Sequence, residues 1–364
     1  MFLHERKSWT EFRWNSERLL PLLADVRHLQ GRFLGQMESL GFPLQEEAVL
    51  TTLTMDVVKS SEIEGEILNQ EQVRSSIARH LGLEVSGLVD SPRNVDGVVE
   101  MMLDATQRYA LPLTEERLCG WHAALFPTGY SGSVKIEVAR YRSGEMQVVS
   151  GAMGKEKVHY EAPAGNRVGE EMKRFLDWFR EDEATDPVLK AAVAHFWFVT
   201  IHPFDDGNGR MARAIADLQL ARSDGSPQRF YSMSNQILAE RNVYYEVLEK
   251  SQRGDGDLTE WLVWFLSCLR RALENSREIL GRVLQKARFW RLHQQVSLND
   301  RQRLMINRLW DGFEGKLTSS KWAKMTKTSS DTALRDIQDL MEKGILRKEA
   351  SGGRSTNYEL ILDE

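Results

Sequence analysis

Apolar residues recur at spacings of three and four along most of the chain, between breaks made of Gly, Pro, Asp or Ser. This spacing places apolar side chains along one face of an α-helix, so it predicts a mainly α-helical fold. An aromatic-rich segment, residues 9–14, is expected to pack against a core, and apolar stripes follow at residues 19–37 and 44–64. We expect the second helix to end at Gly65, because glycine readily adopts the left-handed conformation of a helix C-cap.

Residues 135–162 depart from the helical pattern. Val148, Val149, Val158 and Tyr160 flank a short segment that contains two glycines and several polar residues. β-Branched and aromatic residues on both sides of a glycine-containing turn are typical of a β-hairpin. The segment is therefore predicted to form a short hairpin at the surface.

Two buried helices are predicted around a glycine-rich turn. The first begins at Asp186-Pro187, which suits an N-cap followed by proline in the first helical position, and it runs to about Ile201. The second covers about residues 210–222. A later core helix near residues 258–269 continues into a highly charged helical stretch, which suits an arm leading to a separate unit.

That unit comprises residues 298–364, with helices expected near residues 304–310, 320–325 and 330–343. A glycine-containing segment with strand-forming flanks follows the last helix. Three helices followed by a hairpin predict a winged helix-turn-helix.

The charge of this unit does not favour nucleic acid. Thr332, Arg335 and Gln338 lie on the polar face of the helix that would read DNA, and Arg354 lies in the wing. However, the unit has 12 Lys and Arg against 11 Asp and Glu, a net charge of +1. Three aspartates lie on or beside the same helix: Asp331, Asp336 and Asp339. We therefore expect the unit to contact proteins or to form a homodimer, with DNA as the less favoured partner.

The whole chain has the composition of an ordinary globular protein, with 364 residues of which 41% are hydrophobic, 9% aromatic and 28% charged. Its 48 Lys and Arg against 53 Asp and Glu give a net charge of −5, so it has no general surplus of cations for nucleic acid or an anionic membrane. The apolar run at residues 261–269 is shorter than the about 20 residues that a membrane-spanning helix needs. With no apolar signal segment and two distant cysteines, Cys119 and Cys268, we expect a cytoplasmic protein without disulfides.

Residues 202–213 read His-Pro-Phe-Asp-Asp-Gly-Asn-Gly-Arg-Met-Ala-Arg. A glycine-rich turn that enters a helix presents backbone N–H groups and the positive end of the helix dipole to an anion. Arg210 and Arg213 lie three apart on that helix, so both guanidinium groups can hold oxygens of one polyphosphate. The turn therefore predicts a phosphate site.

Two further side chains of the turn suit chemistry on a bound phosphate. Asp206 offers a hard oxygen ligand, and Mg²⁺ is usually held by one or two carboxylates together with substrate phosphates. His202 titrates near neutral pH and can accept a proton from an attacking hydroxyl. A plain helix corner with capping glycines is the simpler alternative, but it does not require all of these residues in one turn.

At these residues the sequence resembles the Fic family, whose signature His-x-Phe-x-Asp/Glu-Gly-Asn-Gly-Arg-x-x-Arg is met at every specified position. The resemblance implies transfer of AMP from ATP to a hydroxyl side chain of a target protein, with release of pyrophosphate. It makes His202 the general base and Asp206 the ligand of Mg²⁺ or Mn²⁺. It assigns the phosphates of ATP to Asn208, to the backbone at Gly207 and Gly209, to Arg210 (β) and to Arg213 (γ).

The resemblance extends over about residues 113–269. In the family the hairpin before the motif is a flap that pairs with the target segment as an added strand, which here implies that role for the three valines and Tyr160 of the predicted hairpin. Tyr244 and Tyr245 are candidates to wall the adenine, although aromatic residues at helical spacing more often belong to a core.

Ser60, Glu64 and Gly65 match a second Fic pattern, the inhibitory helix Ser/Thr-x-x-x-Glu-Gly/Asn. Glu64 would pair with Arg213, and ATP would then bind in an unproductive pose. The enzyme would be inactive by default. Ser, Glu and Gly also occur at helix ends as plain caps, which is the alternative explanation.

The patterns predict an N-terminal helical module in residues 1–112 with an inhibitory helix near 44–65, a Fic core in 113–270, a helical linker in 271–297 and a winged helix-turn-helix in 298–364. The predicted function is an autoinhibited protein adenylyltransferase that uses ATP and modifies a Ser, Thr or Tyr hydroxyl. Two alternatives stay open: a hydrolase that removes AMP from modified proteins, and a DNA-binding regulator whose Fic core only senses nucleotide. No membrane partner is expected.

Overall fold

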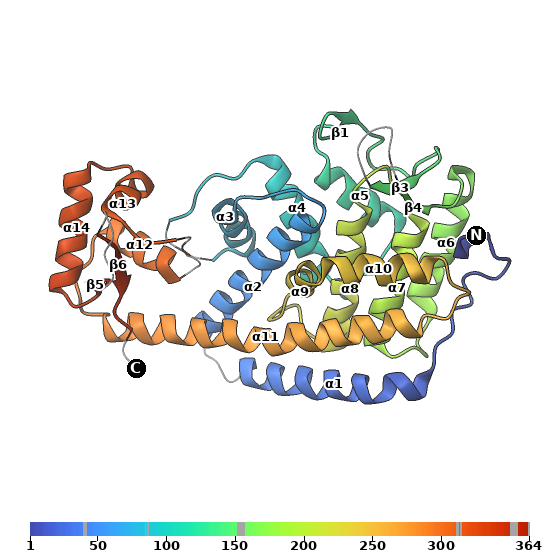
Figure 1. Ribbon diagram of the computed structural model, residues 1–364, viewed down its shortest axis with the longest axis horizontal. Coiled ribbons are helices and arrows are strands. Elements are labelled where there is room, and N and C mark those ends of the chain that lie inside the picture. Colours follow the sequence, from blue (N-terminus) through green and yellow to red (C-terminus); the bar gives the residue numbers. More distant parts are fainter. Residues whose placement is uncertain are drawn as a thin grey trace. The chain divides into compact units, whose positions relative to one another are not determined.

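The computed structural model describes residues 1–38, 42–83, 85, 87–150, 157–310, 313, 315–349 and 356–362. Within them the chain is mainly helical, as the apolar spacing predicts, and it divides into two compact units (Figure 1). The larger unit comprises residues 1–83 and 89–277, and the smaller unit residues 84–88 and 278–364. None of the helices in the described ranges is both long enough and apolar enough to cross a membrane.

Helices α1 to α10 belong to the larger unit, and α11 begins there. Their bounds are α1 (Ser16–Glu38), α2 (Phe42–Ile63), α3 (Gln70–Leu81), α4 (Arg93–Gln107), α5 (Glu115–Leu125), α6 (Val168–Glu181), α7 (Pro187–Ile201), α8 (Asn208–Asp224), α9 (Met233–Ala239), α10 (Arg241–Gln252) and α11 (Thr259–Leu292). Short 3₁₀ helices cover Leu3–Glu5 and Gly165–Arg167. Because residues 1–83 and 89–277 form one unit, the expected boundary at residue 112 stays a prediction.

The centre of the larger unit is the pair of buried helices α7 and α8, which pack on each other (Figure 1). Asp186 caps α7, because its side chain accepts a hydrogen bond from the Val188 N–H at 2.8 Å, and Pro187 takes the first helical position. Every residue from 188 to 201 is buried, as is every residue from 210 to 221. The two buried helices around a glycine-rich turn are therefore confirmed.

The aromatic N-terminal segment docks on this core, as expected. Trp9 and Phe12 meet the ring of Trp197 edge to face, with centroids 6.1 and 5.2 Å apart. Arg13 then pairs with the chain ahead of α11, because its carbonyl accepts from the Leu258 N–H at 2.8 Å. The segment thereby fixes the start of α1 against the core.

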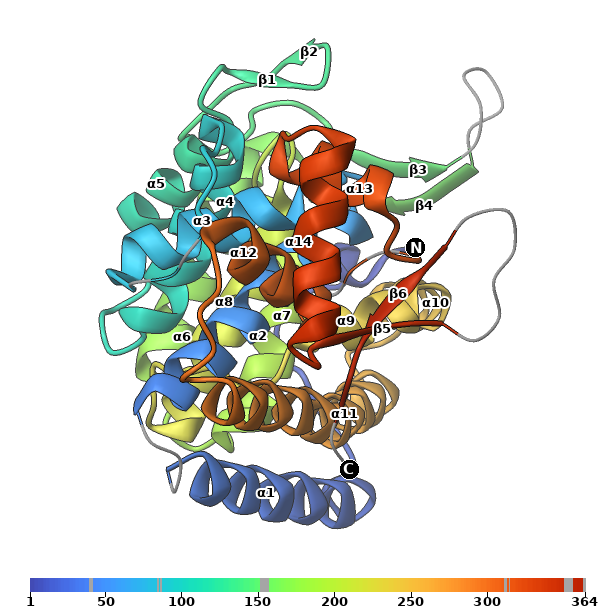
Figure 2. The ribbon, with the colours of Figure 1, turned by 90° about the vertical axis from the view of Figure 1, so that its left-hand side faces the viewer.

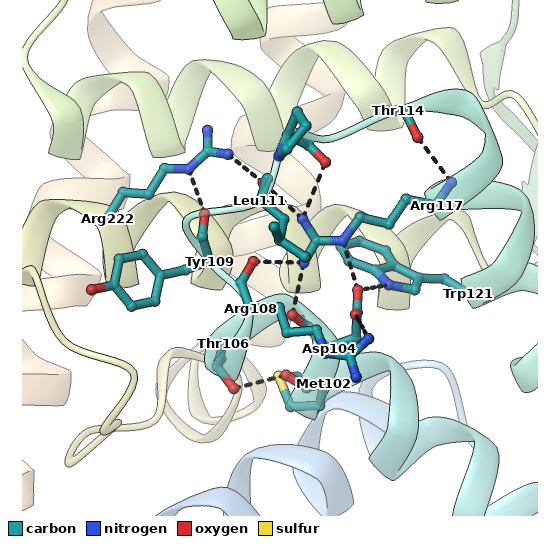
Figure 3. Close-up of polar contacts among 11 residues, drawn as sticks. Met102, Asp104, Thr106, Arg108, Tyr109, Leu111, Thr114, Arg117, Trp121 and Arg222 are labelled. Atoms are coloured by element: carbon teal, nitrogen blue, oxygen red, sulfur yellow. Dashed lines mark hydrogen bonds and ion pairs between the residues drawn. The ribbon is translucent and has the colours of Figure 1, made fainter.

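Figure 3 shows how two arginines hold the connection from α4 to α5. Arg117 donates to the Asp104 carboxylate at 2.6 Å and to the carbonyl of Leu111 at 2.9 Å. Arg222, from α8, donates to the carbonyls of Tyr109 and Leu111 at 2.8 and 2.9 Å. These bonds satisfy backbone carbonyls of the connection itself, and those of Arg222 attach the connection to α8.

The predicted hairpin is present as β3 (Gln147–Ser150) and β4 (Lys157–Glu161), which pair antiparallel with Val148 opposite Tyr160. A smaller pair, β1 (Tyr130–Ser131) with β2 (Val134–Lys135), precedes it. Val149 and Val158 are exposed, as a flap requires. Tyr160 is buried instead, and its hydroxyl donates to the Thr200 carbonyl at 2.7 Å, so the expectation that it contacts a target is wrong. The loop between the strands lies outside the described residues.

The smaller unit contains the second part of α11, then α12 (Asp300–Trp310), α13 (Ser319–Thr326) and α14 (Ser330–Glu342), and the paired strands β5 (Leu346–Lys348) and β6 (Tyr358–Leu360) (Figure 2). Its core is formed by side chains such as Trp322, Ile337 and Leu340, all fully buried. These are the expected helices and hairpin, while membership of the winged-helix class stays a prediction. Arg354, expected in the wing, lies outside the described residues.

Gly97 tests the packing of α4 on α5. A side-chain carbon at Gly97 would collide with the carbonyl of Ala124 in α5, so the two helices approach too closely for alanine. We expect Gly97→Ala to lower the free energy of unfolding by about 1–3 kcal/mol in urea denaturation. Gly120, also helical but with nothing within 4 Å of its added carbon, is the control. Gly120→Ala should leave stability unchanged or raise it by up to about 1 kcal/mol; equal effects at both positions would contradict the close approach.

Candidate active site

The turn between α7 and α8 is built on two left-handed residues, His202 with φ = +52° and Gly207 with φ = +79°. Phe204 anchors it, because its buried ring stacks on His122 with centroids 4.4 Å apart. Asn208 closes it: Oδ1 accepts from the Phe204 N–H at 3.0 Å, and Nδ2 donates to the Phe204 carbonyl at 2.7 Å. The side chain that was expected on a phosphate is thus buried and bonded to backbone, where it shapes the turn.

His202 is partly buried at the start of this turn. Its Nδ1 lies 3.2 Å from the carbonyl oxygen of Val199, which can only accept, so Nδ1 carries the proton. In the neutral ring Nε2 then keeps its lone pair, which is the form that a general base needs. Burial lowers the pKa of His202 below its ordinary value, so the neutral form dominates at pH 7.

Arg142, which the sequence did not reveal, ties this turn to the hairpin. Its Nε donates to the carbonyl of His202 at 2.7 Å, and its terminal nitrogens donate to the carbonyls of Gly144 and Pro163 at 2.6 Å each. Its backbone N–H donates to the carbonyl of Pro203 at 2.9 Å. Gly144 precedes β3 and Pro163 follows β4, so one guanidinium group joins both ends of the hairpin to the residue that carries the candidate base.

The carboxylate of Glu64 lies at the N-terminus of α8. A side-chain carbon at Gly209 would collide with Glu64 Oε1, so only glycine leaves room for the carboxylate at this position. A helix N-terminus attracts anions through its free N–H groups and its dipole. Glu64 therefore occupies the place where the sequence predicts a phosphate.

Arg210 and Arg213, the two arginines in the first turns of α8, are paired with carboxylates from the segment after α2. Arg213 NH2 lies 2.8 Å from Glu64 Oε1, and Arg213 also donates to the hydroxyl (2.9 Å) and carbonyl (2.8 Å) oxygens of Ser60. The Arg213 side chain is only 1% exposed. Arg210 NH1 lies 2.7 Å from Glu66 Oε2. The pairing of Glu64 with Arg213 was expected from the sequence, whereas the contacts of Ser60 and Glu66 were not.

Gly65 explains why both carboxylates face α8. With φ = +86° it ends α2 in a Schellman motif, in which its own N–H bonds the Glu62 carbonyl and the Glu66 N–H bonds the Ser61 carbonyl, each at 3.0 Å. The predicted left-handed cap is therefore confirmed. Glu64 and Glu66 flank the glycine on one hydrogen-bonded turn, so their positions are linked.

Asp206 is the candidate metal ligand. Its Oδ1 accepts from the Gly207 N–H at 2.5 Å and its Oδ2 accepts from the Ser131 hydroxyl, which leaves a further lone pair on each oxygen. No cluster of three or more His, Cys, Asp or Glu side chains in the described parts of the chain could hold a metal alone. One carboxylate fits Mg²⁺ or Mn²⁺ that is held mainly by phosphate oxygens and water.

Two family profiles match the chain. Residues 2–83 match a domain of unknown function (DUF4172), and residues 112–220 match the Fic/DOC family, including the whole turn and both arginines. The candidate active-site turn thus lies within the part of the chain that is similar to the Fic/DOC family.

The chain is also similar to curated proteins of the same family name. The chain is 31% identical over 143 residues to the protein adenylyltransferase Fic of Nematostella vectensis, which covers 38% of this chain and 29% of that protein. It is 40% identical over 91 residues to the protein adenylyltransferase fic-1 of Caenorhabditis elegans, covering 24% and 16%. The chain thus spans less than a third of the length of these relatives.

Solved Fic structures share the fold. A Fic family protein from Desulfovibrio desulfuricans superposes with a TM-score of 0.54 at 23% identity, covering 95% of this chain and 97% of that one. A Fic domain containing signaling protein from Bacteroides thetaiotaomicron gives a TM-score of 0.54 at 20% identity, covering 71% and 97%. At these identities the similarity shows a common fold.

The two candidate adenine contacts lie beyond the Fic domain, and they differ. Tyr244 is buried among aromatic rings and its hydroxyl lies 3.0 Å from Nε2 of His195, a buried histidine whose pKa burial lowers to about 3. Tyr244 is therefore a core residue rather than a wall for adenine. The ring of Tyr245 is 37% exposed beside Arg241, so only this tyrosine offers a free surface.

Arg142 provides a test of how the Fic turn is held. Arg142→Ala would leave four carbonyls, those of His202, Gly144, Pro163 and Ile201, without their charged donor, and we expect a loss of more than about 3 kcal/mol of unfolding free energy. Arg142→Lys should also be destabilised, because an ammonium group cannot reproduce the planar fork. Arg140, which is exposed and pairs with Glu137, is the control, and Arg140→Ala should cost less than about 1 kcal/mol. Equal losses for Arg142→Ala and Arg140→Ala in urea denaturation would contradict the clamp.

Proposed function

We propose that this protein transfers AMP from ATP to a hydroxyl side chain of a target protein. One observation carries the proposal: a single turn combines a neutral histidine with a free Nε2, a hard-oxygen ligand and two phosphate-binding cations, contributed by His202, Asp206, Arg210 and Arg213. The Fic-domain relatives named protein adenylyltransferases support this reaction.

In the proposed reaction, the hydroxyl oxygen attacks the α-phosphorus of ATP, the bond from that phosphorus to the β-phosphate oxygen breaks, and pyrophosphate leaves. His202 Nε2 takes the hydroxyl proton as the new bond forms. Arg210 and Arg213 bind the β- and γ-phosphates and neutralise the charge of the leaving group. Mg²⁺ or Mn²⁺ on Asp206 would supply additional positive charge at the phosphates.

The target segment is proposed to lie along the hairpin. An exposed strand edge can accept an extended peptide as an added strand, with main-chain hydrogen bonds and side-chain contacts. Val149 and Val158 are exposed on β3 and β4, and Arg142 joins this hairpin to the backbone of His202. A bound target would therefore be connected to the general base through one side chain.

The described conformation is proposed to be inhibited. Glu64 occupies the N-terminus of α8 and pairs with Arg213, so the γ-phosphate has to displace a carboxylate to reach its arginine. Glu66 pairs with Arg210 in the same way, which makes it a second inhibitory carboxylate. Transfer of AMP requires both arginines to be released.

The role of His202 can be measured directly. His202→Ala should lower AMP transfer by about 10²–10⁴-fold, the loss typical of a missing general base, while ATP still binds. Because burial lowers the pKa of His202 below the ordinary value of about 6.5, the pH at which the rate falls to half its maximum should lie below 6.5. The rate falls there because the base becomes protonated. Native labelling by His202→Ala, or a half-maximal rate at a pH above 6.5, would remove His202 from the mechanism.

A series of glutamate variants tests the inhibition. Glu64→Gly frees Arg213 and should raise transfer from labelled ATP, including onto the protein itself, and Glu66→Gln should raise it less because Arg213 stays paired. Glu62 also lies near the end of α2 but pairs with Lys59, so Glu62→Gln should behave as the native protein. ATP should also raise the melting temperature more in Glu64→Gly than in the native protein, because the phosphates replace the missing carboxylate.

The double variant Glu64→Gly/Arg213→Ala is the matched control, since it removes the group that the inhibition acts on. It should not be activated. If Glu64→Gly stays folded but leaves transfer unchanged, the inhibitory role is wrong. If Glu64→Gly instead loses the ability to remove AMP from a modified protein, the hydrolase alternative is favoured.

A further inference from the structure

Helices α13 and α14 of the smaller unit form a helix-turn-helix. α13 ends at Thr326 and α14 begins at Ser330, and the turn between them uses Lys327 in the left-handed conformation, with φ = +52°. Ser329 caps α14, because its hydroxyl accepts from the Thr332 N–H at 3.2 Å. The two helices pack through buried residues such as Trp322 and Ile337, and exposed residues lie on another side of α14.

The structure changes the charge argument against DNA, because one of the three aspartates of α14 is buried and a second, which is partly exposed, is paired with a lysine of the same unit. Asp336 is only 5% exposed and accepts hydrogen bonds from Arg301 at 2.7 and 2.9 Å and from Asn299 at 2.9 Å. Asp339 accepts from Gln302 at 2.6 Å and from Lys343 at 2.5 Å. Asp336 is paired with Arg301 and Asp339 with Lys343, so each carboxylate has a cation within the unit that reduces its repulsion of a phosphate backbone.

The side of α14 that meets solvent has a different composition. Its exposed residues over the first three turns are Ser330, Asp331, Leu334, Arg335 and Gln338. On α13 and the turn, Lys321, Lys324 and Lys327 are exposed and follow one another at intervals of three, which places them along one side of that helix. Among the described residues, no ion pair involves Lys324, Lys327 or Arg335. We call Lys324, Lys327, Leu334, Arg335 and Gln338 the HTH face.

We propose that the HTH face binds duplex DNA, with α14 in the major groove. Arg335 and Gln338 lie one turn apart and match the pairing of arginine with guanine and of glutamine with adenine, while Leu334 can contact a thymine methyl group. Lys324 and Lys327, beside the N-terminus of α14, would bind phosphates and fix the register of the helix. The inference is independent of AMP transfer, because it rests on the smaller unit alone.

The test uses the full chain and a random duplex DNA library. Rounds of selection should enrich a sequence motif, and fluorescence anisotropy with the selected duplex should give saturable binding that weakens as salt is raised. Lys324→Gln/Lys327→Gln should weaken binding to all duplexes and reduce the salt slope by about 0.9 for each lost phosphate contact. Arg335→Ala should weaken the selected duplex by about 5- to 150-fold and reduce sequence preference at one position.

Arg303 provides the matched control, because it is an exposed arginine on α12, away from α13 and α14 in the sequence. Arg303→Gln removes one positive charge from the same unit and should leave the affinity and the selected motif unchanged. Absence of saturable binding by the native chain at low salt would overturn the proposal. The proposal would also be overturned if Arg303→Gln weakened DNA binding as much as the HTH-face variants do. It would be overturned as well if the chain bound no DNA and instead formed a dimer that Arg335→Ala disrupts.

Discussion

A buried guanidinium group needs an anion, and this requirement organises the active site. The Arg213 side chain is 1% exposed, and its place in α8 leaves it no route to water. An ion in such a place without a partner costs several kcal/mol, roughly 3–5 when one member of a buried pair is removed. Glu64 provides the partner in this conformation, and a phosphate would provide it in another. In the proposed mechanism, inhibition by Glu64 and binding of the γ-phosphate therefore both satisfy the need of Arg213 for an anion.

The ends of α7 and α8 explain why distant segments converge on this turn. The end of α7 leaves carbonyl groups without helical partners, and the start of α8 leaves N–H groups without them. Arg142 donates to the first set and the Glu64 carboxylate lies at the second. The opposite signs of the two helix ends thus select a cation from the hairpin and an anion from α2.

Features that depend on residues close together in the sequence, such as helix caps and the turn between α7 and α8, can be predicted from the sequence. The caps at Asp186 and Gly65 depend on neighbouring residues, and the structure has both. The phosphate turn likewise fits within twelve residues. Arg142 and Glu66 act on partners 60 and 144 positions away, and neither belongs to a local pattern, so only the fold reveals them.

Burial explains the remaining differences between the sequence and the structure. Tyr160 and Tyr244 have the residue type of a binding surface, but the packing of the N-terminal segment and of α10 encloses both. Asp336 was counted as a surface charge because composition does not distinguish an exposed carboxylate from one bonded to Arg301. Which face of a helix is covered is a tertiary property, and periodicity alone leaves it open when polar residues occupy both sides.

The Schellman turn at Gly65 links the positions of Glu64 and Glu66, the two carboxylates that are paired with Arg213 and Arg210 and that we propose to be inhibitory. In the proposed mechanism a closed molecule has both arginines paired with these glutamates, and an open molecule has both arginines released. Each ion pair favours the closed state, and the hydrogen bonds of the turn couple the two ion pairs. A partner that binds the connection between α2 and α3 in the open state alone needs no contact with the catalytic turn. Such a partner would raise the fraction of open, active molecules by the ratio of its affinities for the two states. Binding at this short connection alone would therefore be enough to control the activity.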